Sequence, residues 1–437
     1  MREKLSFRSG LWVGGMLGML TGLVLAAAPS AVWAADVDGA YKKLRVFSQV
    51  LTYVQQSYVD PVDGEELVYD AIAGMLSGLD PHTTFMRPAE YDKLREDTAG
   101  EFGGLGIEVA PSEAGSPKDR VIVITTVHKD GPGAHAGLKG GDHVVAVDGE
   151  SIRGESLDAS VRLMRGVPGT RVVLSVERTG WSRPRDVPLV RRQVRVPSVD
   201  LDAFDIPGKG DVGYLRIKSF QERTDQEVGA ALAELRRRAR EHGNKGLLGL
   251  VVDLRDNPGG LLDEGVKVAD RFLATGVIVT TEGRNPKTRE RELAHNDGTE
   301  PDFPLVVLVN AGTASASEIL AGALQDQKRA AIVGERSFGK GSVQTLFGLD
   351  DGAGLKLTIA RYYTPSGRSI QDRGVQPDVP VRREPGPLVA VSGPERVATD
   401  PQLAAGIDAI RRAAGLNPGT SGQNRSPLGA ADLARTR

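Results

Sequence analysis

Hydrophobic residues recur at helical spacing in the N-terminal part of the chain, between Tyr41 and Leu79. Apolar positions three and four residues apart share one face of a helix, so this stretch predicts two or three amphipathic helices. Leu79-Asp80-Pro81-His82 ends it, because proline and the residue before it resist helical backbone. The periodic positions are Leu44, Phe47, Val50, Leu51, Val54, Leu67, Ile72, Met75 and Leu76.

Short strands separated by glycine begin at Phe102 and continue to residue 176. They include a glycine-rich segment at 103–109, the alternating run 121–124 and a last strand at 171–176. This pattern predicts a small β-rich module.

Strands and helices alternate from Val212 onward, which predicts an α/β core. The nearly continuous apolar runs at 246–254 and 305–309 are typical of buried parallel strands. Prolines at 380, 385, 387 and 394 predict a linker, and Leu403, Ile407 and Ile410 predict one short helix before a polar, disordered tail. The other predicted elements are strands at 212–217 and 330–333 and helices at 226–242, 261–273 and 314–325.

The first residues have the pattern of an export signal. Arg2, Lys4 and Arg8 precede the uncharged run Leu11–Ala28, and small residues precede a cleavage point after Ala34. An uncleaved membrane anchor is the alternative, because the run approaches the length that spans a bilayer. Both interpretations place the body of the protein outside the cytoplasm.

Composition narrows the chemistry that the core can perform. The 437 residues include no cysteine, which excludes disulfides, thiolate zinc sites and cysteine nucleophiles. The 55 basic and 57 acidic residues nearly cancel, so the charge does not favour nucleic acid as a partner. None of the 6 histidines lies in a motif typical of a catalytic base.

Two segments at predicted strand-to-helix junctions carry candidate chemistry. Gly259 and Gly260 offer backbone N–H groups to a negative oxygen, although an ordinary loop explains them as well. Ser315 begins a predicted helix after a buried strand, where a nucleophilic hydroxyl is well placed; Ser315 with Glu318 also fits a structural capping box.

A third segment, at 338–344, contains a lysine between glycines. A lysine in that setting is commonly a solvent-exposed loop residue. If Lys340 is buried, however, desolvation disfavours its charged form, and the neutral amine is a competent general base. Gln344 follows in a predicted strand, from which its side chain can hold the amine in place.

Taken together, these segments resemble the carboxyl-terminal processing peptidases, also called tail-specific proteases. This family comprises serine endopeptidases with a Ser–Lys dyad. The resemblance implies that Ser315, and not Ser317, is the nucleophile, that Lys340 is the base and that Gln344 supports it. We expect the N–H groups of Ala316 and of Gly259 or Gly260 to form the oxyanion hole. The matching segments are 74–83, 104–107, 253–260, 313–318, 334–344 and 362–371.

The resemblance also identifies the β-rich module as a PDZ domain. In that fold the loop formed by Gly104, Leu105, Gly106 and Ile107 presents N–H groups to a chain-terminal carboxylate. The implied fold is a mixed, crotonase/Clp-like α/β protease core with an inserted PDZ domain and terminal helical segments. The expected divisions are 1–34 (signal or anchor), 35–100 (helical), 101–183 (PDZ), 184–384 (core) and 385–437 (linker, helix and tail).

The expected partners are polypeptides with accessible C-termini, and neither a metal nor a cofactor is needed. We expect a periplasmic or cell-envelope location, with membrane association only if the N-terminal segment is retained. Family members often work with an adaptor protein, but no residue here names one. The apolar faces at 41–79 and 403–414 predict either contacts in a homo-oligomer or packing on the core.

Two other functions remain open from the sequence. A non-enzymatic exported PDZ scaffold or chaperone would explain the loop at 104–107, but not the three separated motifs of the core. A secreted serine hydrolase acting on a non-peptide substrate is the third hypothesis.

Overall fold

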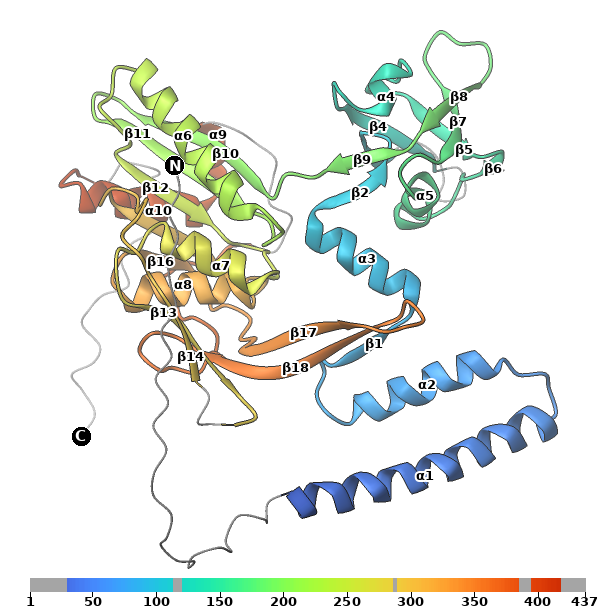
Figure 1. Ribbon diagram of the computed structural model, residues 1–437. Coiled ribbons are helices and arrows are strands. Elements are labelled where there is room, and N and C mark those ends of the chain that lie inside the picture. The colour runs from blue at the N-terminus through green and yellow to red at the C-terminus, as the bar shows by residue number, and fades with distance from the viewer. Residues whose placement is uncertain (1–29, 113–119, 286–288, 385–393, 418–437) are drawn as a thin grey trace, which may run out of the picture. The chain divides into compact units, whose positions relative to one another are not determined.

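The structure is a computed structural model that describes residues 30–112, 120–285, 289–384 and 394–417 (Figure 1). The chain divides into two compact units, residues 1–74 and 75–437. The predicted signal run Leu11–Ala28 and much of the predicted linker and tail lie outside the described residues.

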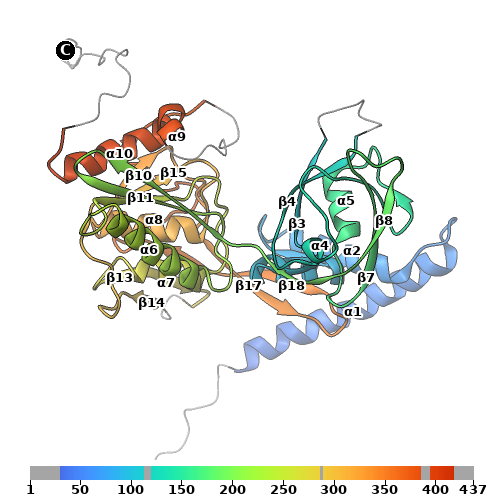
Figure 2. The same cartoon turned by 90° about the horizontal axis from the view of Figure 1, so that it is seen from above.

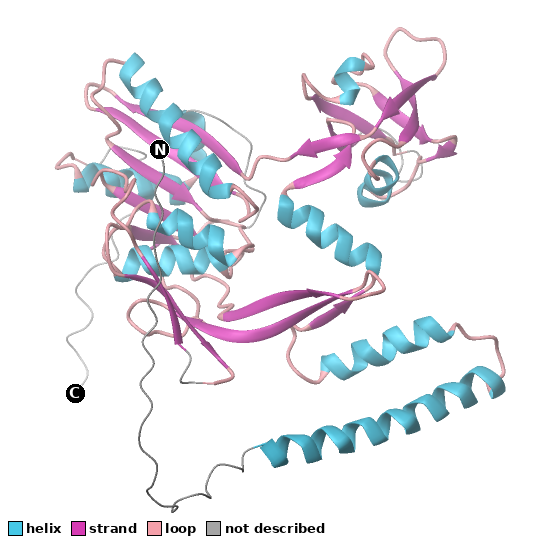
Figure 3. Cartoon of the chain, viewed as in Figure 1, coloured by secondary structure: helices cyan, strands magenta, loops and turns pink. Residues whose placement is uncertain are grey.

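Two helices dominate the N-terminal region, as the periodicity predicts: α1 (Ser30–Ser57) and α2 (Gly64–Ser77) (Figure 3). The Asp63 side chain accepts a hydrogen bond from the N–H of Glu65 (2.8 Å), which satisfies a donor in the first turn of α2. None of the helices in the described ranges has the length and apolar content needed to cross a membrane. The apolar face of α1 is exposed at Tyr41, Leu44, Phe47, Val50 and Tyr53.

The β-rich module is a sheet in the order β3-β4-β5-β7-β8, with β6 paired to β5. Val144, Ile152, Leu174 and Val176 are buried in its interior. Strand β8, which extends the sheet past residue 183, was not predicted. It is an edge strand that begins with the charged pair Arg185-Asp186 and contains Pro188, so its apolar pattern is weak. The elements are β3 (Ile107–Pro111), β4 (Ile122–Val127), α4 (Pro132–His135), β5 (His143–Val147), β6 (Glu150–Ser151), α5 (Leu157–Met164), β7 (Arg171–Glu177) and β8 (Arg185–Val190).

The α/β core is built on a sheet in the order β10-β11-β12-β15-β16-β19, parallel from β11 onward. Successive residues of β15 face opposite sides: Val307 packs with helices α6, α7 and α8, whereas Leu308 packs with α10. Figure 2 shows the sheet between these helices. The strands are β10 (Val199–Ile206), β11 (Gly210–Ile217), β12 (Gly249–Asp253), β15 (Leu305–Val309), β16 (Ala331–Gly334) and β19 (Val379–Pro380).

The core helices lie close to their predicted positions: α6 (Thr224–Glu241), α7 (Leu262–Asp270), α8 (Ala316–Asp326) and α10 (Pro401–Ala413), the last preceded by α9 (Pro394–Thr399). In α10 the apolar side chains of Leu403, Ile407 and Ile410 are buried against the sheet. Of the two expectations for this helix, packing on the core is therefore confirmed.

A second sheet, in the order β1-β18-β13-β14 with β17 paired to β18, was not predicted as a unit. Its strands mix exposed and half-buried residues, so apolar alternation is weak. Its elements are β1 (Thr84–Met86), β13 (Val277–Gly283), β14 (Arg289–Leu293), β17 (Ser342–Gly348) and β18 (Gly354–Tyr363); helix α3 (Pro88–Ala99) and the pair β2 (Glu101–Gly104) and β9 (Arg192–Arg195) complete the fold.

Candidate active site

Two loops interlock at the carboxyl edge of the core sheet. Strands β12 and β15 are parallel neighbours, so the segments that follow them meet at one edge. Asn257 joins three parts: its Nδ2 donates to Ile217 O (2.8 Å), its Oδ1 accepts from Gly259 N (2.9 Å), and its backbone O accepts from Ala314 N (3.0 Å). The motifs at 253–260 and 313–318 are thereby held against each other.

Ser315 lies immediately before α8 with a φ of 56° and a ψ of −118°, a conformation that non-glycine residues rarely adopt. Its backbone O accepts hydrogen bonds from Glu318 N (2.8 Å) and from the Tyr362 hydroxyl (3.1 Å). Strained backbone of this kind persists only where the surroundings hold it, and it clusters at functional sites.

The Glu318 carboxylate holds this conformation and also reaches the lysine segment. Its Oε2 accepts from the backbone N–H of Ser315 (2.9 Å) and of Lys340 (2.8 Å), while Oε1 accepts from Gly339 N (2.7 Å) and from the Ser337 hydroxyl. Burial raises the pKa of Glu318, and the four hydrogen bonds oppose that shift. One fully buried carboxylate therefore couples the backbone at Ser315 to the backbone at Lys340.

Glycine is required at 259 and 260 because the backbone passes very close to its neighbours. A Cβ on Gly259 would lie 2.7 Å from the Cβ of Ser315, and a Cβ on Gly260 would lie 2.1 Å from the carbonyl O of Phe220. The Gly259 N–H is engaged by Asn257, whereas the described residues offer no hydrogen-bond acceptor to the N–H of Gly260 or Ala316. Two bare donors therefore lie near Ser315.

Lys340 is half-buried, so its side chain lies between the solvent-exposed and the buried interpretations of its motif. Burial lowers the pKa of its amine, and the nearby charge of Lys356 lowers it further, while Glu318 and Asp80 act in the opposite direction. The neutral amine is thus more accessible than in an exposed lysine.

Gln344 lies in β17 opposite Thr358 of β18, next to a break in the strand register. Its Nε2 donates to the hydroxyls of Ser342 (2.8 Å) and Thr358 (3.3 Å). Bulges of this kind change the direction of side chains along a strand.

One cavity of about 560 Å³ brings the candidate residues together. Its lining includes Gly259, Gly260, Ser315, Lys340 and Gln344, so motifs far apart in the sequence meet at one site. Ala316, which is 1% exposed, adjoins Ser315 in the chain but does not line the cavity.

A buried ionic cluster stabilises the loop at 253–260 where it leaves β12. Arg255 Nη2 donates to Asp253 Oδ2 (2.6 Å) and to Asp400 Oδ2 (2.7 Å), and its Nη1 donates to Gln402 Oε1 (3.0 Å). Tyr214 donates to the same Asp253 carboxylate (2.7 Å). Because removal of one partner from a buried ion pair leaves an uncompensated charge, this cluster ties the C-terminal helices to the loop.

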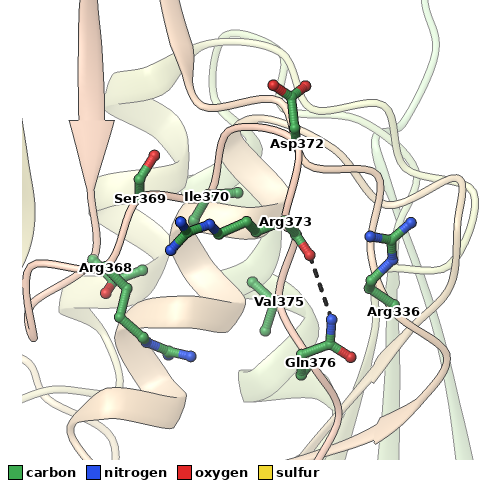
Figure 4. Close-up of a pocket in the computed structure, with 10 residues that line it drawn as sticks. Arg336, Arg368, Ser369, Ile370, Asp372, Arg373, Val375 and Gln376 are labelled. Carbon is green, nitrogen blue, oxygen red and sulfur yellow. Dashed lines mark hydrogen bonds between the residues drawn. The ribbon is translucent and has the colours of Figure 1, made fainter.

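A second pocket, of about 370 Å³, is lined by Arg336, which follows β16, and by Arg368 and Arg373 of the loop at 364–376 (Figure 4). The loop at 364–376 contacts the lysine segment through its backbone and a side chain: Asp372 N donates to Gly339 O (2.8 Å), and the side-chain Oε1 of Gln371 accepts from Gly341 N (3.0 Å). The motif at 362–371 therefore supports the lysine segment, while Ser315 does not line this pocket.

The loop at 104–107 contributes to a cavity of about 480 Å³ in which Gly104, Leu105 and Ile107 lie with Val161 and Met164 of α5. Gly106 has a positive φ of 65°. No hydrogen bond from the N–H of Leu105 or Gly106 is found within the described residues. An apolar recess beside N–H groups that have no acceptor can bind the apolar last residue of a polypeptide together with its terminal carboxylate.

The sequence does not reveal the contacts of Tyr362 and Thr358, and it reveals only one of the contacts of Glu318, that with Ser315. The Tyr362 hydroxyl lies within hydrogen-bond distance of the backbone O of both Ser315 and Lys340, which share its one hydrogen. The capping-box spacing identifies the contact between Glu318 and Ser315, but no local pattern reveals the contacts with Gly339 and Lys340.

Comparison with known proteins identifies the chain as a peptidase. The sequence model of peptidase family S41 matches residues 211–381, that of the PDZ domain matches 123–178, and that of the activating protease CtpB N-terminal domain matches 27–89. The carboxy-terminal-processing protease of Bartonella bacilliformis is 41% identical over 79% of this chain and 76% of that relative. The carboxyl-terminal-processing protease of a Synechocystis strain is 37% identical over 82% and 80%.

The chain therefore belongs to the carboxyl-terminal processing proteases of peptidase family S41, as its motifs indicate. A solved structure, the photosystem II D1 C-terminal processing protease, is 37% identical, covering 77% of this chain and 87% of that one, with a TM-score of 0.45. Family membership favours an enzyme that acts on polypeptides over the scaffold hypothesis.

The close approach of Gly259 to Ser315 generates a direct test. We expect Gly259→Ala to reduce kcat/KM for a polypeptide substrate by about 100-fold or more, because the new methyl group displaces Ser315. Gly298→Ala is the matched control: Gly298 also has a left-handed φ, of 78°, but nothing lies within 4 Å of its added Cβ. Equal activity in the two variants would contradict the tight contact.

Proposed function

We propose that this protein is an exported serine endopeptidase that captures substrate C-termini with its PDZ domain and hydrolyses peptide bonds with a Ser315–Lys340 dyad. The observation that carries the proposal is the shared cavity of Ser315 and Lys340, which Gln344 and Gly260 also line. The N–H groups of Gly260 and of Ala316, the residue after Ser315, have no acceptor among the described residues. The core is proposed to be of the crotonase/Clp-like type, and the PDZ domain is proposed to extend past the expected boundary at residue 183, because β8 belongs to its sheet.

In the proposed mechanism, neutral Lys340 accepts the proton of the Ser315 hydroxyl as its oxygen attacks the substrate carbonyl carbon. The resulting oxyanion accepts hydrogen bonds from the N–H of Ala316 and Gly260, and Gly259 permits the close approach. Lys340 then donates the proton to the leaving amine. Attack by water on the acyl-serine ester releases the second product and restores Ser315.

The proposed capture step uses the unpaired N–H groups of Leu105 and Gly106 to hold the carboxylate of a substrate's last residue. The apolar side chains of Leu105, Ile107, Val161 and Met164 surround the position next to it. The substrate chain would add as a strand along β3, which is the usual geometry of PDZ recognition.

Export to the periplasm or cell envelope is proposed from the N-terminal residues, by a cleaved signal or by an anchor. The relatives include bacterial proteins and a protein named as chloroplastic, from Tetradesmus obliquus. Fractionation of cells that express the full chain distinguishes the two routes.

Cleavage of a disordered polypeptide tests both parts of the proposal. We expect Ser315→Ala and Lys340→Ala each to abolish fragment formation while the circular dichroism spectrum is unchanged, because each variant removes one member of the dyad. The same polypeptide with an amidated C-terminus should be cut with a higher KM, since it lacks the carboxylate.

Full cleavage by either alanine variant would exclude the dyad. An unchanged KM for the amidated polypeptide would exclude carboxylate capture but leave the dyad intact.

The lowered pKa of Lys340 predicts how activity depends on pH. Because the base must be neutral, kcat should rise with pH through the pKa of this amine. Lys356→Gln removes a charge that lowers this pKa, so it should move the rise to higher pH by about 0.5–1 pH unit, since a partly screened repulsion is worth about 1 kcal/mol.

Lys209→Gln, in the exposed turn between β10 and β11, should leave the pH profile unchanged. A flat profile from about pH 5 to 9 would contradict a lysine base.

A further inference from the structure

We propose that Asp80 is a positioning residue of the active site, which acts through Thr83 and Thr358 to turn the oxygen of the Gln344 amide toward the Lys340 amine. The inference rests on the proposed function, because it assumes that Lys340 is the base. It assigns a role to Asp80 and Thr83 within the motif at 74–83, which the catalytic dyad leaves unexplained.

Asp80 lies beside the second sheet, where its carboxylate reaches Thr358 of β18. Its Oδ1 accepts from the N–H of His82 (2.8 Å) and Thr83 (3.0 Å), so the loop folds around the carboxylate. Strand β1 follows at once and pairs with β18, where Thr84 lies opposite Lys356. This pairing brings Asp80 and Thr83 to Thr358, more than 270 residues further along the chain.

The direction of the hydrogen bonds is determined by the carboxylate, which in its ionised form only accepts. Thr83 Oγ1 donates to Asp80 Oδ2 (2.7 Å) and therefore accepts from Thr358 N (3.1 Å). Thr358 Oγ1 donates to Asp80 Oδ1 (3.2 Å). Because a hydroxyl has one hydrogen, Thr358 can only accept from the Gln344 side chain.

Gln344 is thereby held in one of its two amide orientations. Its Nε2 donates one hydrogen to Thr358 Oγ1 (3.3 Å) and the other to Ser342 Oγ (2.8 Å). Its Oε1 has no hydrogen-bond donor among the described residues, and neither does the Lys340 amine have an acceptor there, although both side chains line one cavity. A flipped amide would direct its oxygen at a hydroxyl whose hydrogen is already committed to Asp80.

Asp80 also contributes a charge at the amine. The ionisable groups that act on Lys340 are Lys356 of β18, Glu318 of α8 and Asp80, and Lys340 in turn lowers the pKa of His82. Asp80→Asn therefore has two separable effects: it loosens the Gln344 amide, and it removes a charge that raises the pKa of Lys340. Thr358→Val has only the first effect.

The test is a double-mutant cycle in the full-length chain. We expect Thr358→Val to lower kcat by roughly 10- to 100-fold without moving the pH profile, since the amide loses its orientation. Thr358→Val combined with Gln344→Ala should be no slower than Gln344→Ala alone, because both changes remove one function. Thr358→Ser keeps the hydroxyl and should restore activity.

Thr345→Val is the matched control, since Thr345 is the next residue along β17 and does not line the cavity. Asp80→Asn should lower kcat and move the rise of the pH profile to lower pH, opposite to Lys356→Gln. Multiplicative effects of Thr358→Val and Gln344→Ala, or an unchanged kcat in Asp80→Asn, would overturn the inference.

The activities of the Ser315→Ala and Lys340→Ala variants test the proposed function independently of this cycle. If Ser315→Ala or Lys340→Ala retains full activity, the dyad itself is wrong. If both are inactive and the cycle is multiplicative, only the positioning role of Asp80 fails.

Discussion

A single buried carboxylate, that of Glu318, is the interaction on which the site depends. It accepts hydrogen bonds from the backbone of Ser315 and of Lys340, two residues that belong to different motifs and different elements. A buried charge costs free energy unless hydrogen bonds compensate for it, and here four donors compensate in part for the burial that raises the pKa of Glu318. Any displacement of either segment therefore leaves part of this charge unsatisfied.

The unusual backbone around the site follows from this constraint. Ser315 is held at a positive φ because the Glu318 carboxylate accepts a hydrogen bond from its N–H and the Tyr362 hydroxyl contacts its carbonyl O. Gly259 passes so close that no side chain fits there. Arg255 of the same segment donates a hydrogen bond to Asp400, which precedes α10. The sheet edge, the loop and the C-terminal helices therefore form one supporting structure. The strain at Ser315 is thus maintained by contacts that lie outside the reacting atoms.

The sequence predicts those features that depend on local pattern. Continuous apolar runs identify the buried strands β12 and β15, and a serine three residues before a glutamate identifies the start of α8. The strand that carries Gln344 is predicted, but its pairing with β18 in a second sheet is not, because the burial of these strands depends on which elements cover them. For the same reason, local pattern reveals the contact of Glu318 with Ser315 but not its contact with Lys340. The link from Asp80 to Gln344 requires the pairing of β1 with β18.

Kinetics of a Glu318→Gln variant measure the central claim most directly. Glutamine preserves the size of the side chain, but one carboxylate oxygen becomes an N–H₂ group that faces donors and cannot accept from them. If Glu318 holds Ser315 and Lys340 in place, kcat/KM for a disordered polypeptide falls by about 100-fold or more while the circular dichroism spectrum stays that of the unmodified protein. Unchanged kcat/KM in a folded Glu318→Gln variant would contradict the account.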